Sequence, residues 1–493
     1  MVTTTRTDPP NDCILTIDLG SSSVRATLHD GTGTHVEGTE EQISYEFDRA
    51  ADGTATKDAD DLLSLTARAI DGVLSKAGGR GISAVATSTF WHSVLGMDSA
   101  GVPTTPILTW SDRRAAEAAA ELRSRLDEET IHRRTGCVLH SSYLPAKLLW
   151  LSRANPEAFE KSELFLSPGE YMYSKLFGEA RAGTSMASAT GLFNQNEKRW
   201  DREVLAALPV NKDQLSEISD EPSQGLLGEW AERWPTLKDV PWFPAVGDGA
   251  CSNIGSGCVT PDRLALMVGT SGAMRVLWRE DHVEVPPGPW CYRADSDRFV
   301  MGGALSDGGN LVAWLRETLR LPDEEQTEKK LATMKPDTHG LTFLPLLNGE
   351  RGPGWADKAN GTIAGLSMSS GPVEIMRAAM EAVALRFALI QKTLDRVFPG
   401  DKEIVASGGG LLNSPAWTQI IADALGRPVT LSGVQEASSR GAALLALEKL
   451  GKLKLEEVEA PLGDTIDPDP QAHKTYRAAL QRQRQLYKAV LEQ

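Results

Sequence analysis

A strand–turn–strand unit with small polar residues in its turn occurs twice in this chain, near residue 20 and again near residue 270. The two turns are Gly20-Ser21-Ser22-Ser23 and Gly269-Thr270-Ser271-Gly272. The flanking apolar and alternating runs predict strands over Cys13–Asp18, Val24–His29, Leu264–Val268 and Ala273–Leu277. Such a repeat suggests two similar halves. Hairpins with glycine turns are common in α/β proteins, so chance explains this feature alone equally well.

The rest of the chain alternates between helical and strand-like patterns. Helices are predicted over Asp58–Ala77, Asp112–Leu126, Pro372–Val397, Pro415–Leu425 and Ala437–Leu450, and strands over Ile82–Thr89, Glu403–Ala406 and Pro428–Leu431. Asp58 and Asp60 are candidate caps of the first helix. This alternation predicts an α/β fold with mixed sheets covered by helices. With 493 residues, the chain exceeds one ordinary core and should form two domains of roughly 200–250 residues each.

Composition restricts the partners. The formal net charge of −16 opposes binding to nucleic acid and to anionic membranes, so a small-molecule substrate is expected. No apolar run approaches the roughly 18 residues of a membrane helix, and the N-terminus has no signal-peptide pattern. The five cysteines are widely spaced and odd in number, which fits buried thiols in the reducing cytoplasm. The sequence contains no signal of the oligomeric state, and it is compatible with a homodimer.

Both turns have features of phosphate-binding sites. An acidic residue at a strand end, such as Asp18, can hold Mg²⁺ through water. Small residues in the turns allow backbone N–H groups to approach a phosphate. Each turn taken alone is more simply a plain hairpin.

A third glycine-rich segment, Ser407-Gly408-Gly409-Gly410, leads into a helix. It resembles a dinucleotide fingerprint, but Asn413 stands where the third small residue belongs. No acidic residue ends the next strand, Pro428–Leu431, which disfavours NAD. A P-loop motif is absent from the sequence. A nucleotide could still lie against this turn, with Asn413 capping the helix or touching the base.

Several single residues have both functional and structural interpretations. Asp248 lies between two glycines, and alone it reads as an exposed turn residue. His92 follows Trp91 after a predicted strand, and alone it is more simply structural. Trp110 alone reads as a core residue. Cys251 and Cys258 lack the second pair that a typical metal site requires.

Together these motifs resemble the FGGY family of carbohydrate kinases over residues 12–450. The most specific match is to the family's C-terminal pattern, at Gly361, Ile363, Gly365, Leu366, Glu374, Ile375, Ala378, Ala379, Met380 and Glu381. The N-terminal pattern is matched by Lys147, Trp150 and Leu151, whereas Leu144 stands where a small polar residue or proline is expected.

The resemblance implies two actin-like (ribonuclease H-like) domains beside a central cleft. They should cover residues 1–250, which bind the sugar and hold the first phosphate motif, and 251–450, which bind ATP. A polar, helical extension is expected over 451–493. By resemblance, Asp248 is the catalytic base and Asp18 places Mg²⁺. Gly20, Ser21, Ser22, Arg25, Gly269, Thr270, Gly309, Gly409 and Asn413 would bind the nucleotide and its phosphates, and Trp91 and His92 would face the sugar.

Four local runs resemble the gluconokinase branch of the family: residues 109–114, 268–275, 303–309 and 349–355. The resemblance therefore implies ATP-dependent phosphorylation of D-gluconate. Because gluconate carries a carboxylate, a cation should meet it, and His92, Arg113 and Arg351 are the candidates. The alternatives are a xylulose-type or other polyol kinase and a non-catalytic, actin-like nucleotide sensor.

Overall fold

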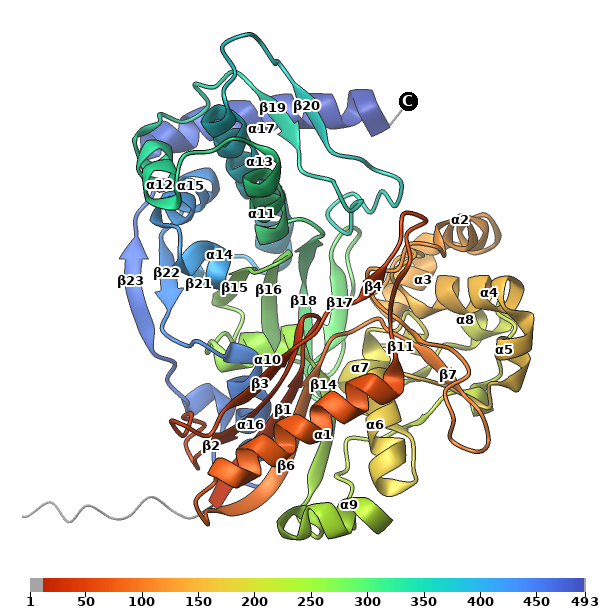
Figure 1. The fold of residues 1–493 in the computed structure, drawn as a ribbon. Helices are drawn as coiled ribbons and strands as arrows, with labels where there is room; N and C mark the ends of the chain where they lie inside the picture. Colours follow the sequence, from red (N-terminus) through yellow and green to blue (C-terminus); the bar gives the residue numbers. More distant parts are fainter. Residues whose placement is uncertain (1–11, 492–493) are drawn as a thin grey trace, which may run out of the picture.

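Two mixed β-sheets form the centres of two domains in the computed structural model, which describes residues 12–491 (Figure 1). The first sheet has the strand order β14-β6-β1-β2-β3, and the second β17-β18-β16-β15-β21-β22-β23. The first comprises β1 (Asp12–Leu19), β2 (Ser23–His29), β3 (Glu41–Ser44), β6 (Gly81–Thr89) and β14 (Trp242–Gly247). The second comprises β15 (Arg263–Val268), β16 (Gly272–Arg279), β17 (Trp290–Arg293), β18 (Arg298–Leu305), β21 (Glu403–Ser407), β22 (Val429–Ser432) and β23 (Leu462–Ile466).

The two sheets repeat the same pairing. β1 is antiparallel to β2 and parallel to β6, and β15 is antiparallel to β16 and parallel to β21. β3 continues the first sheet antiparallel to β2, as β18 does beside β16. β14 is parallel to β6, as β22 is to β21. The repeated unit predicted from the two turns is therefore confirmed, and the expected α/β architecture with mixed sheets is present.

Most predicted helices begin and end close to their expected residues. α13 (Pro372–Val397) and α15 (Pro415–Leu425) have the predicted bounds. α1 (Ala59–Lys76) begins at its cap Asp58, whose side chain accepts a hydrogen bond from the Asp61 backbone N–H. Asp60 instead accepts a hydrogen bond from the Tyr171 hydroxyl.

One helix begins later than predicted. α2 (Ala116–Arg125) leaves residues 112–115 outside the helix. The Asp112 carboxylate accepts hydrogen bonds from the Ala55 and Arg114 backbone N–H groups and from the Arg114 side chain. These contacts hold the segment against β5 (Ala55–Lys57) in a non-helical conformation.

α10 (Asp248–Gly255) and α16 (Ala437–Lys449) follow the equivalent strands β14 and β22 and pack against each other. A Cβ atom at Gly255 would lie 1.9 Å from the Ala437 carbonyl oxygen, and one at Gly441 would lie 1.8 Å from that of Cys251. Only glycine allows this mutual approach of two backbones. α16 also contacts β1 and β6, so a helix of the second half packs on the first sheet.

Smaller elements surround the sheets. The first domain adds α3 (Glu128–Thr135), α4 (Leu144–Ala154), α5 (Pro156–Lys161), α6 (Pro168–Phe177), α7 (Thr184–Ser188), α8 (Arg202–Ala206) and α9 (Gly228–Arg233). Its short strands are β4 (Asp48–Arg49), β7 (Leu95–Met97), β8 (Ile107–Leu108), β9 (Leu164–Leu166), β10 (Arg181–Ala182), β11 (Phe193–Asn194), β12 (Arg199–Trp200) and β13 (Glu217–Ile218). The second domain adds α11 (Gly309–Thr318), α12 (Glu324–Thr333), α14 (Gly409–Leu412), β19 (Thr342–Leu344) and β20 (Thr362–Ala364).

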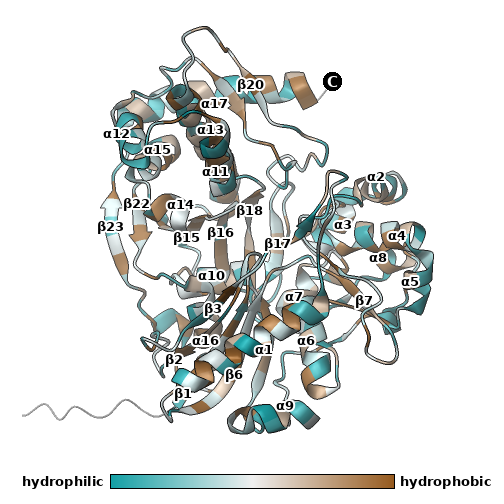
Figure 2. Ribbon diagram, viewed as in Figure 1, coloured by the Kyte–Doolittle hydropathy of each residue, from teal (hydrophilic) through white to brown (hydrophobic). Residues whose placement is uncertain are grey.

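Residues after 450 are expected to form a polar extension, but they complete the second domain. β23 adds a strand to its sheet, and α17 (Pro470–Leu491) packs on α13 and α15. The side chain of Tyr476 in α17 is fully buried and donates a hydrogen bond to Glu381 of α13. Figure 2 shows both hydrophilic and hydrophobic residues along α17, as expected for a helix with one buried face.

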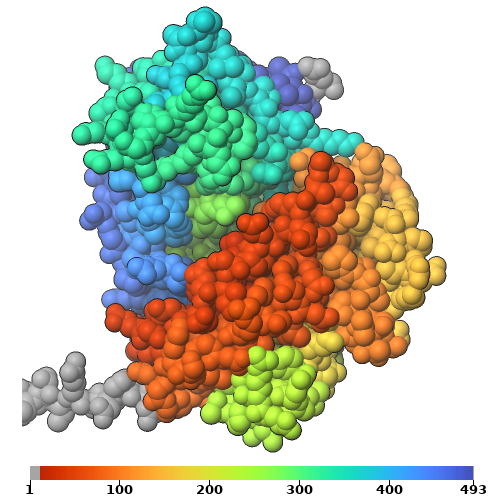
Figure 3. Space-filling view, viewed as in Figure 1, coloured from red at the N-terminus to blue at the C-terminus, as the bar shows by residue number. Residues whose placement is uncertain are grey.

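All five cysteines are buried free thiols, as predicted. Within residues 12–491, none of the helices has the length and apolar character needed to cross a membrane. On the face drawn in Figure 3, the red and orange surface of the first domain meets the cyan and blue surface of the second.

Candidate active site

A cavity of about 400 Å³, here called the central cavity, lies between the two sheets and is lined by both domains. The predicted site residues that line it are Asp18, Gly20, Ser21, Ser22, Arg25, Trp91, His92, Asp248, Gly269, Thr270 and Arg351. A nucleotide-side cavity of about 580 Å³ is lined by Gly309, Gly409 and Asn413 and shares Gly269 and Thr270 with the central cavity. Arg113 lines a third, outer cavity of about 440 Å³.

Asp248 is the first residue of α10, directly after β14. The structure corrects the prediction of an exposed turn residue, because its side chain is half-buried at a helix start. Its flanking glycines make room for Trp91: a Cβ atom at Gly247 would lie 1.8 Å from the indole Cε2, and one at Gly249 would lie 2.6 Å from Cζ3. Burial raises the pKa of Asp248, while the charges of Arg275 and Arg351 oppose the rise. A carboxylate of this kind is a stronger base than an exposed one.

Asp18 ends the predicted first strand and faces the same cavity. Burial, and then the nearby charge of Asp248, raise its pKa to about 7. Its Oδ1 atom is buried without a hydrogen-bond partner, and the nearest cation is Arg25, 3.9 Å from Oδ2. A buried, unpaired carboxylate oxygen is the type of ligand that Mg²⁺ prefers, so these residues fit a metal ion.

Arg25 connects the domains. Its guanidinium pairs with Glu436, just before α16, and donates a 3.0 Å hydrogen bond to Gln42. The resemblance places this side chain near the transferring phosphate. It does line the central cavity, but its charge is already shared with a carboxylate of the second domain.

Trp91 and His92 form an aromatic wall with residues from both domains. Trp91 lies 5.1 Å from Tyr292 between ring centroids, and His92 lies 4.9 Å from Tyr143 and 5.3 Å from Tyr292. His92 has a φ of 62°, unusual for a non-glycine residue. Lys147 is buried and donates hydrogen bonds to the carbonyls of His92, Thr109 and Ser142, which hold this turn in place.

The surroundings of His92, one of the carboxylate-binding candidates, oppose a charged imidazole. Burial, and then the charge of Arg351, lower the pKa of His92 far below its ordinary value. Its Nδ1 atom lies 2.6 Å from the Ala189 carbonyl and therefore carries the proton. His92 is thus neutral, and its Nε2 atom can accept a hydrogen bond from a hydroxyl group but supplies no cation.

Arg351 is the candidate cation that lines the central cavity. Its guanidinium lies 5.0 Å from the ring centroid of Trp110, and its Nε is buried without a hydrogen-bond partner. Trp110 is half-buried: it packs against the core of the first domain, as predicted, and also lines this cavity. Its indole face supports the Arg351 cation.

Arg113 contacts the second domain instead of the central cavity. Its Nη2 donates a 2.6 Å hydrogen bond to the Asp357 backbone carbonyl. Arg351 lines the outer cavity together with Arg113, but of the two arginines only Arg351 also lines the central cavity.

Sequence reasoning missed Arg275 of β16 as a site residue. It is 3% exposed, lines the central cavity, and is the charge that acts most strongly on Asp248. No signal in the sequence identified it, because its position depends on a tertiary contact: a Cβ atom at Gly249 would lie 2.3 Å from Arg275 Nη1.

The nucleotide-side cavity has apolar and polar walls. Its lining includes Leu331, Met376, Met380 and Trp417, with Asn310 and Asn413 among the polar groups. Ser414, not Asn413, caps α15. The volume and mixed lining fit a nucleoside, and the shared Gly269-Thr270 turn gives its phosphates a path to the central cavity.

Comparisons with known proteins agree with this geometry. Residues 13–255 match the family model for the FGGY family of carbohydrate kinases, N-terminal domain, and residues 264–449 match that for the C-terminal domain. Gluconokinase of Bacillus subtilis (strain 168) is 27% identical over 483 residues, spanning 95% of this chain and 94% of that protein.

Solved structures are similar over nearly the whole chain. The crystal structure of gluconate kinase from Lactobacillus acidophilus has a TM-score of 0.89 at 28% identity, covering 97% of this chain and 98% of that one. Ligand-bound xylulose kinase from the same organism has a TM-score of 0.88 at 27% identity, with the same coverage. Both family models match, and together they span most of the chain, so this protein belongs to the FGGY family of carbohydrate kinases.

Proposed function

We propose that this kinase transfers the γ-phosphoryl group of ATP to the terminal 6-hydroxyl of D-gluconate. The observation that carries the proposal is the central cavity itself. It combines the raised-pKa carboxylates of Asp248 and Asp18, both small-residue turns and the cation of Arg351. The gluconokinase and gluconate kinase relatives support the choice of acceptor.

Asp248 acts as the general base in this proposal. Its carboxylate accepts the proton of the acceptor hydroxyl as the oxygen attacks the γ-phosphorus. The P–O bond to ADP breaks, and the acceptor oxygen becomes part of the new phosphate ester. A positioned base of this kind contributes on the order of 10²–10⁴-fold to the rate. Burial supports this role because it raises the proton affinity of the carboxylate.

The two turns hold the phosphates. The Gly20 and Gly269 N–H groups are used inside the turns, where they donate to the Ser23 and Ser271 carbonyls. The backbone N–H groups of Ser21, Ser22 and Thr270 remain for a bound phosphate chain, which is reached from both domains. Asp18 is the residue that would hold Mg²⁺, which would supply charge neutralisation on the phosphates. Gly309, Gly409 and Asn413 would bind the nucleoside.

The acceptor lies against the aromatic wall. Trp91 excludes water beside Asp248, and the neutral His92 can accept a hydrogen bond from a hydroxyl group. Exclusion of water prevents the phosphate from being hydrolysed instead of transferred. Arg351 offers a cation for the carboxylate of a sugar acid.

A coupled ADP-release assay on the purified protein tests the proposal. Gluconate, other aldonic acids, xylulose, glycerol and C6 polyols would be compared by kcat/KM. Gluconate is expected to have the highest value. The similarity to xylulose kinase makes a pentulose the second candidate, and a higher kcat/KM with xylulose than with gluconate would replace gluconate as the acceptor.

A further inference from the structure

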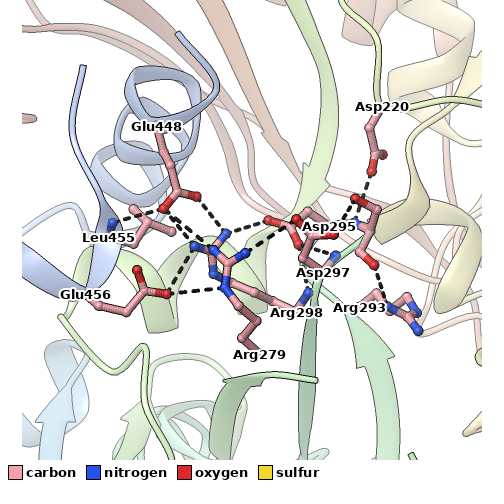
Figure 4. A network of polar contacts seen from close by, with 10 residues as sticks. Asp220, Arg279, Arg293, Asp295, Asp297, Arg298, Glu448, Leu455 and Glu456 are labelled. Atoms are coloured by element: carbon pink, nitrogen blue, oxygen red, sulfur yellow. Dashed lines mark hydrogen bonds and ion pairs between the residues drawn. The ribbon is translucent and has the colours of Figure 1, made fainter. Parts of the chain in front are cut away.

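Five arginines are buried among the described residues: Arg275, Arg293, Arg298, Arg377 and Arg386. Four of them have acceptors within the protein. These acceptors are the Gln195 carbonyl for Arg293, the Asp295, Glu448 and Glu456 carboxylates for Arg298, the Glu381 carboxylate for Arg377 and the Glu350 carboxylate for Arg386. Figure 4 shows the contacts of Arg298, whose guanidinium is surrounded by carboxylates. Each of these four guanidinium groups has at least one hydrogen bond or ion pair, although Nε of Arg298 and of Arg386 has no hydrogen-bond partner.

Arg275 is the exception. Its side chain is 3% exposed, yet within residues 12–491 it makes no hydrogen bond and no ion pair, and its Nε is buried without a partner. A buried charge without a partner is costly, and arginine is almost never buried in this way. Its guanidinium lines the central cavity. A molecule bound in that cavity is therefore in a position to supply the hydrogen-bond acceptor that the guanidinium lacks.

Local structure directs this guanidinium toward the central cavity. Because Gly249 has no side chain, Arg275 Nη1 occupies the space beside Asp248 and Trp91. Burial lowers the pKa of Arg275 to about 10, and Asp248 opposes the shift, so the group is charged at neutral pH. Arg351, with its own unpartnered Nε, lines the same cavity.

We infer that Arg275 is a specificity-determining residue whose guanidinium binds the carboxylate of the acceptor, with Arg351 as a second cation in the same cavity. This inference rests on the proposed function. A sugar acid gives the buried guanidinium the charge-assisted hydrogen bonds that it lacks. A neutral polyol of the same length leaves it unpaired, so the site discriminates against neutral acceptors as well as in favour of acids.

The test compares Arg275→Met, Arg275→Lys and the control Arg279→Met with the wild type. Arg279 lies on the same strand, with a side chain that is 52% exposed and pairs with Asp297, Glu448 and Glu456 (Figure 4). The measurements are kcat/KM and calorimetric Kd for gluconate and other aldonates, the same for D-glucitol, xylulose and glycerol, and KM for MgATP. A thermal melt of each variant reports folding.

The expected result is a loss of about 10- to 100-fold in kcat/KM and in affinity for the acid with Arg275→Met. Any loss that comes from the altered pKa of Asp248 should be shared by acids and neutral acceptors, so the ratio of kcat/KM for acids to that for neutral acceptors should still fall by about 10- to 100-fold. The KM for MgATP should change less than about threefold. Arg275→Lys should lie between Arg275→Met and the wild type, because an ammonium group keeps the charge without the two-pronged geometry. Arg279→Met should match the wild type.

Other outcomes separate this inference from the proposed function. If Arg275→Met raises the KM for MgATP while the affinity for the acid is unchanged, the guanidinium binds a phosphate and the inference is overturned. Equal losses with acids and neutral acceptors overturn it as well. If the wild type prefers an aldonate other than gluconate and Arg275→Met abolishes that preference, the inference stands. Only the choice of gluconate as the substrate is then wrong. A wild type that uses neutral acceptors alone overturns both.

Discussion

The Asp357 carboxylate of the second domain lies 2.8 Å from Nε2 of His140 in the first domain. The Ser141 side chain and backbone N–H donate hydrogen bonds to the same carboxylate, and Arg113 donates one to the Asp357 backbone carbonyl. Arg351 lies on the same loop as Asp357. These contacts therefore hold the Arg351 loop of the second domain against the first domain. Phosphoryl transfer by a two-domain kinase requires such closure.

Replacing Asp357 with alanine should loosen this connection. We expect an increase of about tenfold in KM for the acceptor, because Arg351 loses its fixed position, with a smaller change in KM for MgATP. Small-angle scattering of the ligand-free protein should give a larger radius of gyration than the wild type. Lys358→Ala on the same loop, which removes only an exposed ion pair with Glu117, serves as the control. An unchanged KM and radius would show that the contact does not control closure.

Asp248→Asn should reduce kcat by about 10²–10⁴-fold, since the amide cannot accept the hydroxyl proton. Calorimetry should still detect binding of MgATP and gluconate. The melting temperature at pH 7 should not fall, because the variant removes a buried charge whose pKa is raised. Asp239→Asn, an exposed carboxylate before β14, is the matched control. Retention of more than a tenth of wild-type turnover by Asp248→Asn would exclude Asp248 as the base.

Asp18→Asn should change the pH dependence of stability in a defined direction. The folded protein holds the Asp18 proton with a pKa of about 7, against about 3.9 in an unfolded chain. The folded state therefore binds more protons between these values, and wild-type stability falls as pH rises through this window. Without Mg²⁺, the variant should melt at a higher temperature than the wild type at pH 8, and the difference should vanish near pH 4.

The same variant tests the metal site. Mg²⁺ should raise the melting temperature of the wild type at pH 8 but leave Asp18→Asn unchanged, because ligand binding stabilises only the state that binds it. The Mg²⁺ titration of activity should flatten in the variant. An identical Mg²⁺ response in both proteins would remove Asp18 from the metal site.

Arg351→Ala and Arg113→Ala should have different effects, although the sequence placed both arginines near a substrate carboxylate. Arg351 lines the central cavity, so its loss should raise KM for gluconate by about tenfold or more and affect neutral acceptors little. Arg113 donates to Asp357, so its loss should weaken binding of acids and neutral acceptors equally. Steady-state kinetics with gluconate and D-glucitol distinguish the two cases. Acid-selective loss in Arg113→Ala would contradict this assignment.

Patterns within short segments were sufficient to predict most of the secondary structure and the family. The bounds of α13 and α15 follow from apolar periodicity and from the prolines at their first turns, which are properties of neighbouring residues. Strand ends and glycine-flanked acids are local features, which singled out the two turns, Asp18 and Asp248, but the roles predicted for them came from the family resemblance. α2 was misplaced at its start because Asp112 is bound by Ala55, a residue far away in the sequence.

The direction in which long cationic side chains point was decided by tertiary structure alone. Arg113 and Arg351 both lie in runs similar to gluconokinases, yet one donates to Asp357 and the other lies over Trp110. Arg275 enters the central cavity only because Gly249, on a helix of the other domain, has no Cβ. Periodicity determines which residues form a strand, but the partner of a buried guanidinium depends on which distant backbone packs beside it, and no local pattern records that contact.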